Sequence, residues 1–172
     1  MIVWLIGLSG AGKTTVGTRL AARLRADLPN LVYLDGDLLR DVWGGDLSHD
    51  LAGREVNAAR LSKLCRMLGK QDIHVVAAVL SIFPQWQAWN RQHLVDYFEV
   101  FLDVPMDVVV ARDTKGLYRP ALDGEIRDVV GVDIPFPQPA SPDLVLDSSG
   151  RDGTPDELVE RILAALPTLV SR

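Results

Sequence analysis

The chain alternates between short, continuously apolar runs and longer segments in which apolar residues recur every three or four positions. Continuous apolarity is typical of parallel strands covered on both faces, and the longer spacing is typical of amphipathic helices. The apolar runs predict strands at residues 2–6, 31–34, 73–80, 97–102 and 144–146. The longer segments predict helices at residues 13–25, 50–69, 84–94, 105–112 and 154–169. This order predicts an α/β fold, a parallel sheet of about five strands with helices on both faces.

The helix predicted at residues 50–69 has recognisable ends and an apolar stripe. Asp50 is suited to the N-cap, and Gly69 is suited to end the helix. The stripe contains Cys65, the only cysteine, which predicts a buried free thiol and excludes both an internal disulfide and a cysteine-rich zinc site. The helices predicted at residues 84–94 and 105–112 each begin with a proline, a residue suited to the first helical turn.

One stretch interrupts this regular order. Residues 113–142 are rich in glycine, proline and charged residues. An irregular segment of this length is uncommon inside a compact domain unless it forms a lid or a binding loop. We therefore predict a lid segment, residues 113–142, within a single domain that spans residues 1–172.

Composition and charge narrow the class of protein. The 172 residues are 48% hydrophobic and 24% charged, ordinary values for a soluble globular domain. The net charge of −5 argues against a nucleic-acid-binding surface but leaves room for a small anionic ligand. The apolar run at residues 2–6 lacks a basic flank and is far shorter than the ~20 residues that span a bilayer. We expect a cytoplasmic protein with neither nucleic-acid nor membrane partners.

Residues 7–14 read Gly-Leu-Ser-Gly-Ala-Gly-Lys-Thr and match the phosphate-binding P-loop pattern, between a predicted strand and a predicted helix. In this pattern backbone N–H groups and the helix N-terminus bind phosphate oxygens, the lysine bridges the β- and γ-phosphates, and the threonine hydroxyl reaches Mg²⁺. The sequence therefore predicts ATP and Mg²⁺ as cofactors. The candidate cofactor-binding residues are Gly7, Ser9, Gly10, Ala11, Gly12, Lys13, Thr14 and Thr15.

A P-loop alone is compatible with a switch GTPase, an ATPase motor or a small-molecule kinase. The chain lacks the Asn-Lys-x-Asp motif that reads guanine, and the apolar run at residues 73–80 leads into Ser81 rather than a metal-binding aspartate. A kinase is favoured. A non-catalytic nucleotide sensor is the alternative from another class, and the two carboxylates described next argue against it.

Asp35 and Asp37 directly follow the strand predicted at residues 31–34, at the sheet edge where α/β proteins bind ligands. A kinase needs a carboxylate there to take the acceptor's hydroxyl proton, although Asp-Gly-Asp is also typical of a turn or helix cap. Arg54 and Asn57 share one face of the following helix, where they could hold an anionic acceptor or be solvated. Arg40 precedes them. Lys115 is one of only four lysines and stands out in its Gly-Leu-Tyr loop.

Taken together, these motifs resemble adenylyl-sulfate (APS) kinases, P-loop enzymes that transfer the γ-phosphate of ATP to the 3′-hydroxyl of adenylyl sulfate. The resemblance covers nearly the whole chain. It rests on residues 4–14, Leu-Asp-Gly-Asp at 34–37, Arg40, Arg54-x-x-Asn57, Phe-Glu-Val-Phe-Leu-Asp at 98–103, Ala-Arg-Asp-Thr-Lys-Gly-Leu-Tyr at 111–118, Gly-Glu-Ile at 124–126 and Gly-Val-Asp at 131–133.

The resemblance implies a role for each matched residue. Asp37 acts as general base, with Lys13 and Lys115 as the other catalytic residues, and Asp35 and Thr14 lie near Mg²⁺. Arg112 lies near the ATP phosphates. The residues implied in acceptor binding are Asp35, Arg40, His49, Arg54, Asn57, Ser81, Lys115, Leu117 and Val129. The resemblance also implies a homodimer.

The departures from the family pattern cluster around the acceptor. His49 and Val129 stand where the family has two base-stacking phenylalanines, and Gly53 stands where the family usually has aspartate. The family's Ser-Pro pair becomes Ser-Ile-Phe-Pro at 81–84, followed by Trp86 and Trp89, which either pack on their helix or line the acceptor site. These changes resemble a subgroup associated with surface polysaccharides, some members of which phosphorylate cytidine diphosphoramidate. Two acceptors therefore remain open: adenylyl sulfate by default, or cytidine diphosphoramidate or a related nucleotide.

Overall fold

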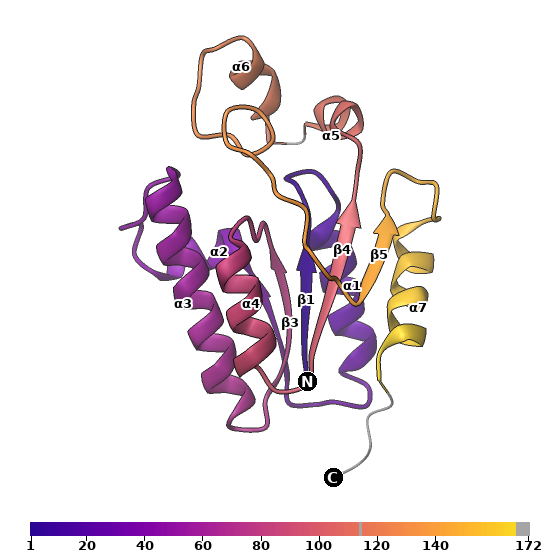
Figure 1. Ribbon diagram of the computed structural model, residues 1–172. Coiled ribbons are helices and arrows are strands. Elements are labelled where there is room, and N and C mark those ends of the chain that lie inside the picture. Colours follow the sequence, from indigo (N-terminus) through magenta and orange to yellow (C-terminus); the bar gives the residue numbers. More distant parts are fainter. Residues whose placement is uncertain (114, 168–172) are drawn as a thin grey trace.

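The computed structural model describes residues 1–113 and 115–167. Its centre is a five-stranded parallel sheet in the order β2-β3-β1-β4-β5 (Figure 1). The strands are β1 (Ile2–Ile6), β2 (Leu31–Asp35), β3 (His74–Val79), β4 (Tyr97–Asp103) and β5 (Leu144–Asp147). The predicted parallel sheet is confirmed, and each strand lies within one residue of its predicted bounds.

Helices cover both faces of this sheet. Helices α1 and α7 pack against each other on one face, and α3 and α4 pack together on the other (Figure 1). The helices are α1 (Lys13–Leu24), α2 (Gly36–Val42), α3 (Leu51–Gly69), α4 (Pro84–His93), α5 (Met106–Arg112), α6 (Tyr118–Leu122) and α7 (Pro155–Ala165). No helix in the described part of the chain is long and apolar enough to cross a membrane.

The central strand explains why the sequence pattern is continuously apolar. Val3 and Leu5 of β1 belong to the core on the α1 and α7 side, whereas Ile2, Trp4 and Ile6 belong to the core on the α3 and α4 side. Successive side chains of a strand point to opposite faces, so both sets must be apolar when both faces are covered. The hydrophobic effect therefore fixes this strand in the middle of the sheet.

Several predicted helix ends are confirmed, and others move. The Asp50 carboxylate caps α3 by accepting from the Gly53 N–H, and Cys65 is fully buried. Pro84 opens α4 as predicted, whereas Pro105 is the N-cap of α5 rather than its first residue. The final helix begins after its N-cap Thr154 and ends at Ala165, earlier than predicted. Residue 169, its predicted end, lies outside the described residues.

Two helices were not predicted. Helix α2 begins directly after β2, where the sequence predicts no helix, because the Asp35 carboxylate accepts a hydrogen bond from the Asp37 N–H at 3.0 Å and caps the new helix. Helix α6 lies inside the lid segment, which was predicted to be irregular. The Asp113 carboxylate accepts from the N–H groups of Leu117 and Tyr118 at 2.8 and 3.0 Å, and so organises the turn that begins α6.

The part of the lid segment that contains α6 lies above the carboxyl ends of the strands, and the rest runs down along the sheet to the start of β5 (Figure 1). The phenol of Tyr118, itself buried, donates to the Ser9 carbonyl of the P-loop at 2.9 Å. Further along, the Asp133 carboxylate accepts from the N–H groups of Asp128 and Val129, each at 2.7 Å. The lid segment thus has local structure of its own and is fastened to the phosphate-binding loop beneath it.

Candidate active site

A cavity of about 1300 Å³ opens at the carboxyl ends of the strands. One side is formed by the P-loop and the start of α7, the other by α2, α3 and the end of β3, and the lid segment closes the top. Sites for single small molecules usually measure roughly 300–1,000 Å³. A cavity of this size has room for more than one small molecule. We call its P-loop side the donor half and its α2 and α3 side the acceptor half, after the roles predicted from the sequence.

The P-loop half of the cavity is built largely from backbone. Gly10 and Gly12 have φ values of 80° and 86°, in the left-handed region that glycine adopts without strain. Gly12 is also the N-cap of α1 and has no side chain to occupy the N–H groups of the first turn. These N–H groups face the cavity at the positive end of a helix dipole, an arrangement that attracts phosphate.

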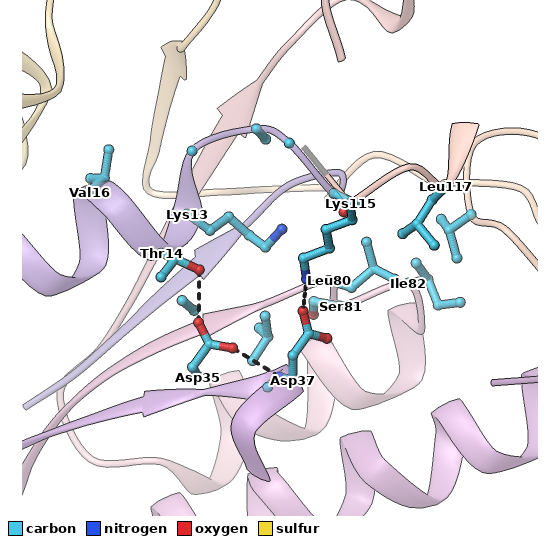
Figure 2. Close-up of a pocket in the computed structure, with 18 of the residues that line it drawn as sticks. Lys13, Thr14, Val16, Asp35, Asp37, Leu80, Ser81, Ile82, Lys115 and Leu117 are labelled. Atoms are coloured by element: carbon cyan, nitrogen blue, oxygen red, sulfur yellow. Dashed lines mark hydrogen bonds and ion pairs between the residues drawn. The ribbon is translucent and has the colours of Figure 1, made fainter. Parts of the chain in front are cut away.

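Lys13 extends from the start of α1 into the cavity (Figure 2). Its ammonium group donates to the Leu8 carbonyl at 2.8 Å. Burial, opposed in part by the Asp37 carboxylate, lowers the pKa of Lys13 to about 8. The ammonium group is therefore poorly compensated by the protein itself. A bound polyphosphate would supply the missing negative charge.

Asp35 lies at the end of β2 and is held by three donors. Its carboxylate accepts from the Thr14 hydroxyl at 2.8 Å and caps α2 by accepting from the Asp37 N–H (Figure 2). It also accepts from the Tyr33 phenol at 3.1 Å. Burial and the adjacent Asp35 carboxylate raise the pKa of Tyr33 above its ordinary value, so the phenol remains a donor. A Cβ at Gly17 would lie 2.7 Å from the Tyr33 ring, and a glycine there makes room for it.

Asp37 lies in the first turn of α2, and its carboxylate forms an ion pair with Lys115 of the lid segment (Figure 2). Burial favours the neutral acid, but the ammonium groups of Lys115 and Lys13 outweigh it, so the pKa of Asp37 lies below its ordinary value. Asp37 is thus a carboxylate at neutral pH. Its side chain remains 68% exposed and is accessible from the cavity.

Arg54 spans the acceptor half of the cavity. Its Nε–H donates to the His49 carbonyl at 2.6 Å, and its Nη2 donates to the Asp128 carbonyl of the lid segment at 2.7 Å. Arg40 donates to the Ser48 carbonyl at 3.0 Å in the same loop. The two guanidinium groups fix loops on both sides of the cavity and carry positive charge into it.

Two further side chains on this side have defined roles in the geometry. The Trp43 indole donates to the Asn57 Oδ1 at 3.0 Å, which fixes the amide so that its N–H₂ group faces the α2 backbone and the cavity. Burial and the positive charges of Arg40 and Arg54 lower the pKa of His49, so its imidazole is largely neutral at pH 7. The acceptor half therefore presents neutral polar groups, Asn57 and His49, as well as the two guanidinium cations.

On the donor side, Arg112 at the end of α5 contacts the P-loop. Its guanidinium donates to the Gly10 carbonyl at 3.3 Å and to the Ser148 carbonyl at 2.9 Å. The Ser148 hydroxyl in turn donates to the Ala11 carbonyl at 2.8 Å. These bonds join α5, the turn after β5 and the phosphate-binding loop at one end of the cavity.

The structure brings nearly all of the predicted site residues to this cavity. Those that line it are Ser9, Gly10, Ala11, Gly12, Lys13, Thr14, Thr15, Asp35, Asp37, Arg40, His49, Arg54, Asn57, Ser81, Arg112, Lys115, Leu117 and Val129. Gly7 does not line it. A Cβ there would lie 2.8 Å from the Leu102 carbonyl, so Gly7 serves the close packing of the loop on β4.

Other cavity residues did not stand out in the sequence. Trp4, Ile82, Phe83 and Ile126 line the acceptor half, although each reads as an ordinary core residue in sequence. The sequence left open whether Trp86 and Trp89 pack on their helix or line the site. Trp86 lines the cavity, whereas Trp89 packs against the core beneath α3 and α4 and stacks on His93. Arg60 does not line the cavity and forms an ion pair with Asp46.

Thr14 and Asp35 offer two adjacent oxygen ligands for a metal ion. Within residues 1–113 and 115–167, no cluster of three or more His, Cys, Asp or Glu side chains is suited to hold a metal ion by itself. Mg²⁺ is usually held by one or two protein oxygens together with substrate phosphates and water. The donor set therefore fits Mg²⁺ that arrives with a nucleotide.

Comparison with known proteins places this geometry in a family. A family model described as adenylylsulphate kinase matches residues 1–147. The cytidine diphosphoramidate kinase of Campylobacter jejuni is 41% identical over 165 residues, which cover 96% of this chain and 95% of that protein. The adenylyl-sulfate kinase of Myxococcus xanthus is 38% identical over 151 residues, 86% of this chain and 81% of that one.

Solved structures agree. The Mycobacterium tuberculosis APS kinase in complex with AMPPNP and APS superposes with a TM-score of 0.85 at 34% identity, and covers 96% of each chain. The shikimate kinase of Aquifex aeolicus is 20% identical with a TM-score of 0.59, a likeness of fold alone. The predicted P-loop kinase fold is thereby confirmed, and the chain belongs to the adenylylsulphate kinase family of phosphotransferases.

Proposed function

We propose that this protein transfers the γ-phosphate of ATP to the ribose 3′-hydroxyl of a nucleotide. One observation carries the proposal: Asp37 is an ionised, accessible carboxylate between the P-loop lysine on one side and Arg40 and Arg54 on the other. A group in this place is within reach of a donor phosphate and of an anionic acceptor. A nucleotide sensor has no use for such a base, because it has no proton to remove.

In the proposed reaction the acceptor's 3′-oxygen attacks the γ-phosphorus, the bond from that phosphorus to the β,γ-bridging oxygen breaks, and ADP leaves. Asp37 accepts the hydroxyl proton. Lys13 and the N–H groups of the P-loop stabilise the negative charge on the phosphates. Because Lys115 pairs with Asp37 in the free enzyme, acceptor binding must displace its ammonium group from the base. The freed Lys115 can then approach the phosphates as the lid segment closes and excludes water.

Thr14 and Asp35 would hold Mg²⁺ with the ATP phosphates, and the ion would supply charge neutralisation at the β- and γ-oxygens. The Tyr33 hydroxyl donates to the Asp35 carboxylate and so orients it for this purpose. Thr15, Gly12 and Arg112 also line the cavity and complete the proposed donor site.

Adenylyl sulfate is the default acceptor, since most of the related proteins described by substrate are adenylyl-sulfate kinases. A specific observation favours cytidine diphosphoramidate as the second candidate. The cavity has His49 and Val129 at the two positions proposed to flank the acceptor base. An aromatic platform contributes ~1–3 kcal/mol per stacked base, and Val129 cannot supply one. The 41% identity to a cytidine diphosphoramidate kinase over almost the full length of both chains supports the same choice.

The acceptor is tested by turnover. The protein with ATP and Mg²⁺ is assayed separately with adenylyl sulfate, cytidine diphosphoramidate, and CMP, and the position of the new phosphate is read by ³¹P NMR. We expect a 3′-phosphorylated product from at least one of the first two. Strong activity with adenylyl sulfate and none with cytidine nucleotides would remove the second candidate.

The catalytic base is tested by Asp37→Asn, with Asp27→Asn, an exposed carboxylate outside the cavity, as the control. We expect turnover to fall by ~10²–10⁴-fold, the span typical of general-base loss, while calorimetry shows ATP binding intact. Unchanged turnover would reject Asp37 as the base. ATP binding without transfer to any nucleotide in the wild-type protein would instead support the sensor.

The family also supports two coarser proposals. We propose that the protein is a homodimer and acts in the cytoplasm. Light scattering at working concentration tests the first of these, and a monomeric mass would reject it. Fractionation of the source cells tests the second.

A further inference from the structure

Residues 44–50, which we call the acceptor loop, lie between α2 and α3 (Figure 1) and bring His49 to the acceptor half of the cavity. The loop begins at Gly44 and Gly45, whose φ values of 87° and 68° lie in the left-handed region that favours glycine. Six of its seven residues are exposed. The hydrophobic core therefore does not fix this loop, and its position is set by contacts with the two helices.

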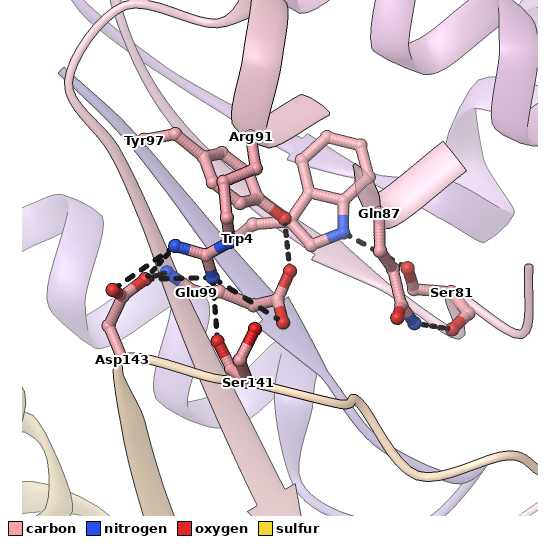
Figure 3. A network of polar contacts seen from close by, with 8 residues as sticks. All are labelled: Trp4, Ser81, Gln87, Arg91, Tyr97, Glu99, Ser141 and Asp143. Atoms are coloured by element: carbon pink, nitrogen blue, oxygen red, sulfur yellow. Dashed lines mark hydrogen bonds and ion pairs between the residues drawn. The ribbon is translucent and has the colours of Figure 1, made fainter. Parts of the chain in front are cut away.

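Another wall of the acceptor half, at Ser81, is held differently. The Trp4 indole donates to the Ser81 hydroxyl oxygen at 3.3 Å, and the Gln87 amide donates to the Ser81 carbonyl at 2.7 Å (Figure 3). The side chains of both donors are buried. That wall is fixed from the core, whereas the acceptor loop is the wall whose position a few surface contacts decide.

Three consecutive carbonyls of the acceptor loop bind the two arginines of the acceptor half. Arg40 donates to the carbonyls of Leu47 and Ser48 at 3.4 and 3.0 Å, and the Arg54 Nε–H donates to the His49 carbonyl at 2.6 Å. Burial and the nearby charge of Arg40 lower the pKa of Arg54, so the two cations are close enough to repel each other. The carbonyl oxygens offset this repulsion. The position of the loop thus sets the position of both guanidinium groups.

The acceptor loop rests on α3 at Gly53, a buried residue of the first helical turn whose N–H donates to the Asp50 carboxylate at 2.8 Å. A Cβ at Gly53 would overlap the Ser48 carbonyl oxygen and lie 2.8 Å from the Ser48 nitrogen, below the 3.0 Å that Cβ atoms keep from other atoms. Both are backbone atoms, so no rotamer change relieves the overlap. Glycine costs a helix about 1 kcal/mol relative to alanine, and helix formation therefore does not explain its presence here.

We propose that Gly53 is a positioning residue for the acceptor: it lets the acceptor loop lie against α3, and the loop in turn places Arg40, Arg54 and the His49 imidazole. The proposal rests on the proposed function, since it concerns the acceptor of that reaction. A guanidinium group carries five N–H donors, so both arginines keep further donors for an anionic acceptor. Gly53 itself has no side chain to touch a ligand and acts only through the loop.

The test compares Gly53→Ala with Gly69→Ala at the other end of α3. A Cβ at Gly69 would lie 3.4 Å from Ile2 in an ordinary contact, and Gly69 does not line the cavity. We expect Gly53→Ala to raise the KM and the calorimetric Kd of the preferred acceptor by about 10- to 100-fold, the loss of a charge-assisted hydrogen bond. ATP affinity and kcat at saturating acceptor should stay the same. Gly69→Ala should change none of these quantities.

A second measurement reports the loop position without any ligand. Burial and the positive charges of Arg40 and Arg54 lower the pKa of His49. If the loop moves away from the arginines in Gly53→Ala, that pKa should rise towards the ordinary histidine value of 6.5, and in Gly69→Ala it should stay in place. Titration followed by NMR measures it, with the His49 resonance assigned from its loss in His49→Gln.

An unchanged acceptor Kd in Gly53→Ala would overturn the proposal, whether or not the pKa of His49 moves. A weakened acceptor affinity with an unchanged pKa would reject the loop as the intermediary. Equal losses of ATP and acceptor affinity would also overturn it, because the effect would then extend beyond the acceptor half. Failure of the proposed function looks different, since the wild-type protein would phosphorylate no nucleotide. Calorimetry with the acceptors and the NMR titration still decide the role of Gly53 in that case.

Discussion

The donor half and the acceptor half of the cavity, named for their proposed ligands, are built by different means. In the donor half, the backbone of consecutive residues forms the site, with Gly10 and Gly12 in the left-handed region and α1 beginning at Lys13. In the acceptor half, side chains that are distant in sequence meet. Arg54 of α3 donates to the His49 carbonyl and to the Asp128 carbonyl of the lid segment, 74 residues away. Eight consecutive residues can thus form a phosphate-binding loop, whereas the acceptor half forms only when distant segments of the fold come together.

The difference also appears in electrostatics. In the donor half, Lys13 has too little negative charge around it, and its pKa is lowered. A bound phosphate would supply that charge. In the acceptor half of the free enzyme, charged side chains already have partners within the protein. Lys115 pairs with Asp37, and Arg54 engages two carbonyls. Acceptor binding must therefore exchange existing contacts, whereas donor binding mostly adds new ones.

The largest effect on ligand binding is expected from Lys13→Met in the donor half. Loss of the ammonium group should weaken ATP binding by at least about 100-fold, as measured by calorimetry, because charge-assisted hydrogen bonds to phosphate are among the strongest in proteins. The same change should stabilise the free enzyme. The pKa of Lys13 is about 8 in the folded state against 10.5 for an ordinary lysine, so at pH 7 the folded protein carries a disfavoured charge.

The Lys13 side chain is only partly buried, so solvent screens part of its charge. The free energy of unfolding should therefore rise by about 1–2 kcal/mol in Lys13→Met. The gain should be present at pH 7 and should shrink as pH rises from 8 towards 10.5, where the folded wild-type protein releases the proton before the unfolded chain does. Denaturant unfolding of both proteins at pH 7 and pH 10 measures it. If the difference in unfolding free energy between the two proteins were the same at pH 7 and pH 10, the lowered pKa of Lys13 could not be its cause.

A smaller effect is expected from Arg54→Lys in the acceptor half. Lysine keeps the charge but loses the planar fork that reaches two carbonyls at once. Acceptor KM should rise about 10- to 50-fold, whereas ATP affinity should stay the same. Arg60→Lys, in an exposed ion pair on the same helix, is the matched control and should change neither. If ATP affinity fell together with acceptor affinity, the two halves would not be separable in this way.

The smallest effect is expected at the junction of the two halves, from Lys115→Met. Lys115 holds the pKa of Asp37 below its ordinary value, so its removal should raise that pKa. The acid limb of kcat/KM reports the free enzyme and should move to higher pH. Activity should therefore be lost earlier on acidification than in the wild-type protein. Lys70→Met, beyond the end of α3, should leave the profile in place, and a shift to lower pH in Lys115→Met would contradict the assignment.

The sequence predicts the donor half better than the acceptor half, and α2 illustrates the reason. The motif at residues 7–14 has one backbone solution, because its glycines and lysine act locally. Asp-Gly-Asp at 35–37 was compatible with a turn, a cap or a catalytic pair, and in the structure Asp35 both caps α2 and contacts Thr14. One carboxylate serves two purposes that no local pattern distinguishes. Trp43, which orients Asn57 from 14 residues away, carries no sequence signal at all.

From the amino-acid sequence alone came the order of the strands and of all the described helices except α2 and α6, the two-faced burial of the sheet, the phosphate-binding loop and the identity of Asp37 as a candidate base. These features depend on residue periodicity and on motifs of adjacent residues, whose geometry follows from local backbone chemistry. Only the tertiary structure decided that Lys115 pairs with Asp37 and that Arg54 bridges two loops. Those contacts join distant segments, and packing of the whole chain, rather than any local preference, sets which side chains meet.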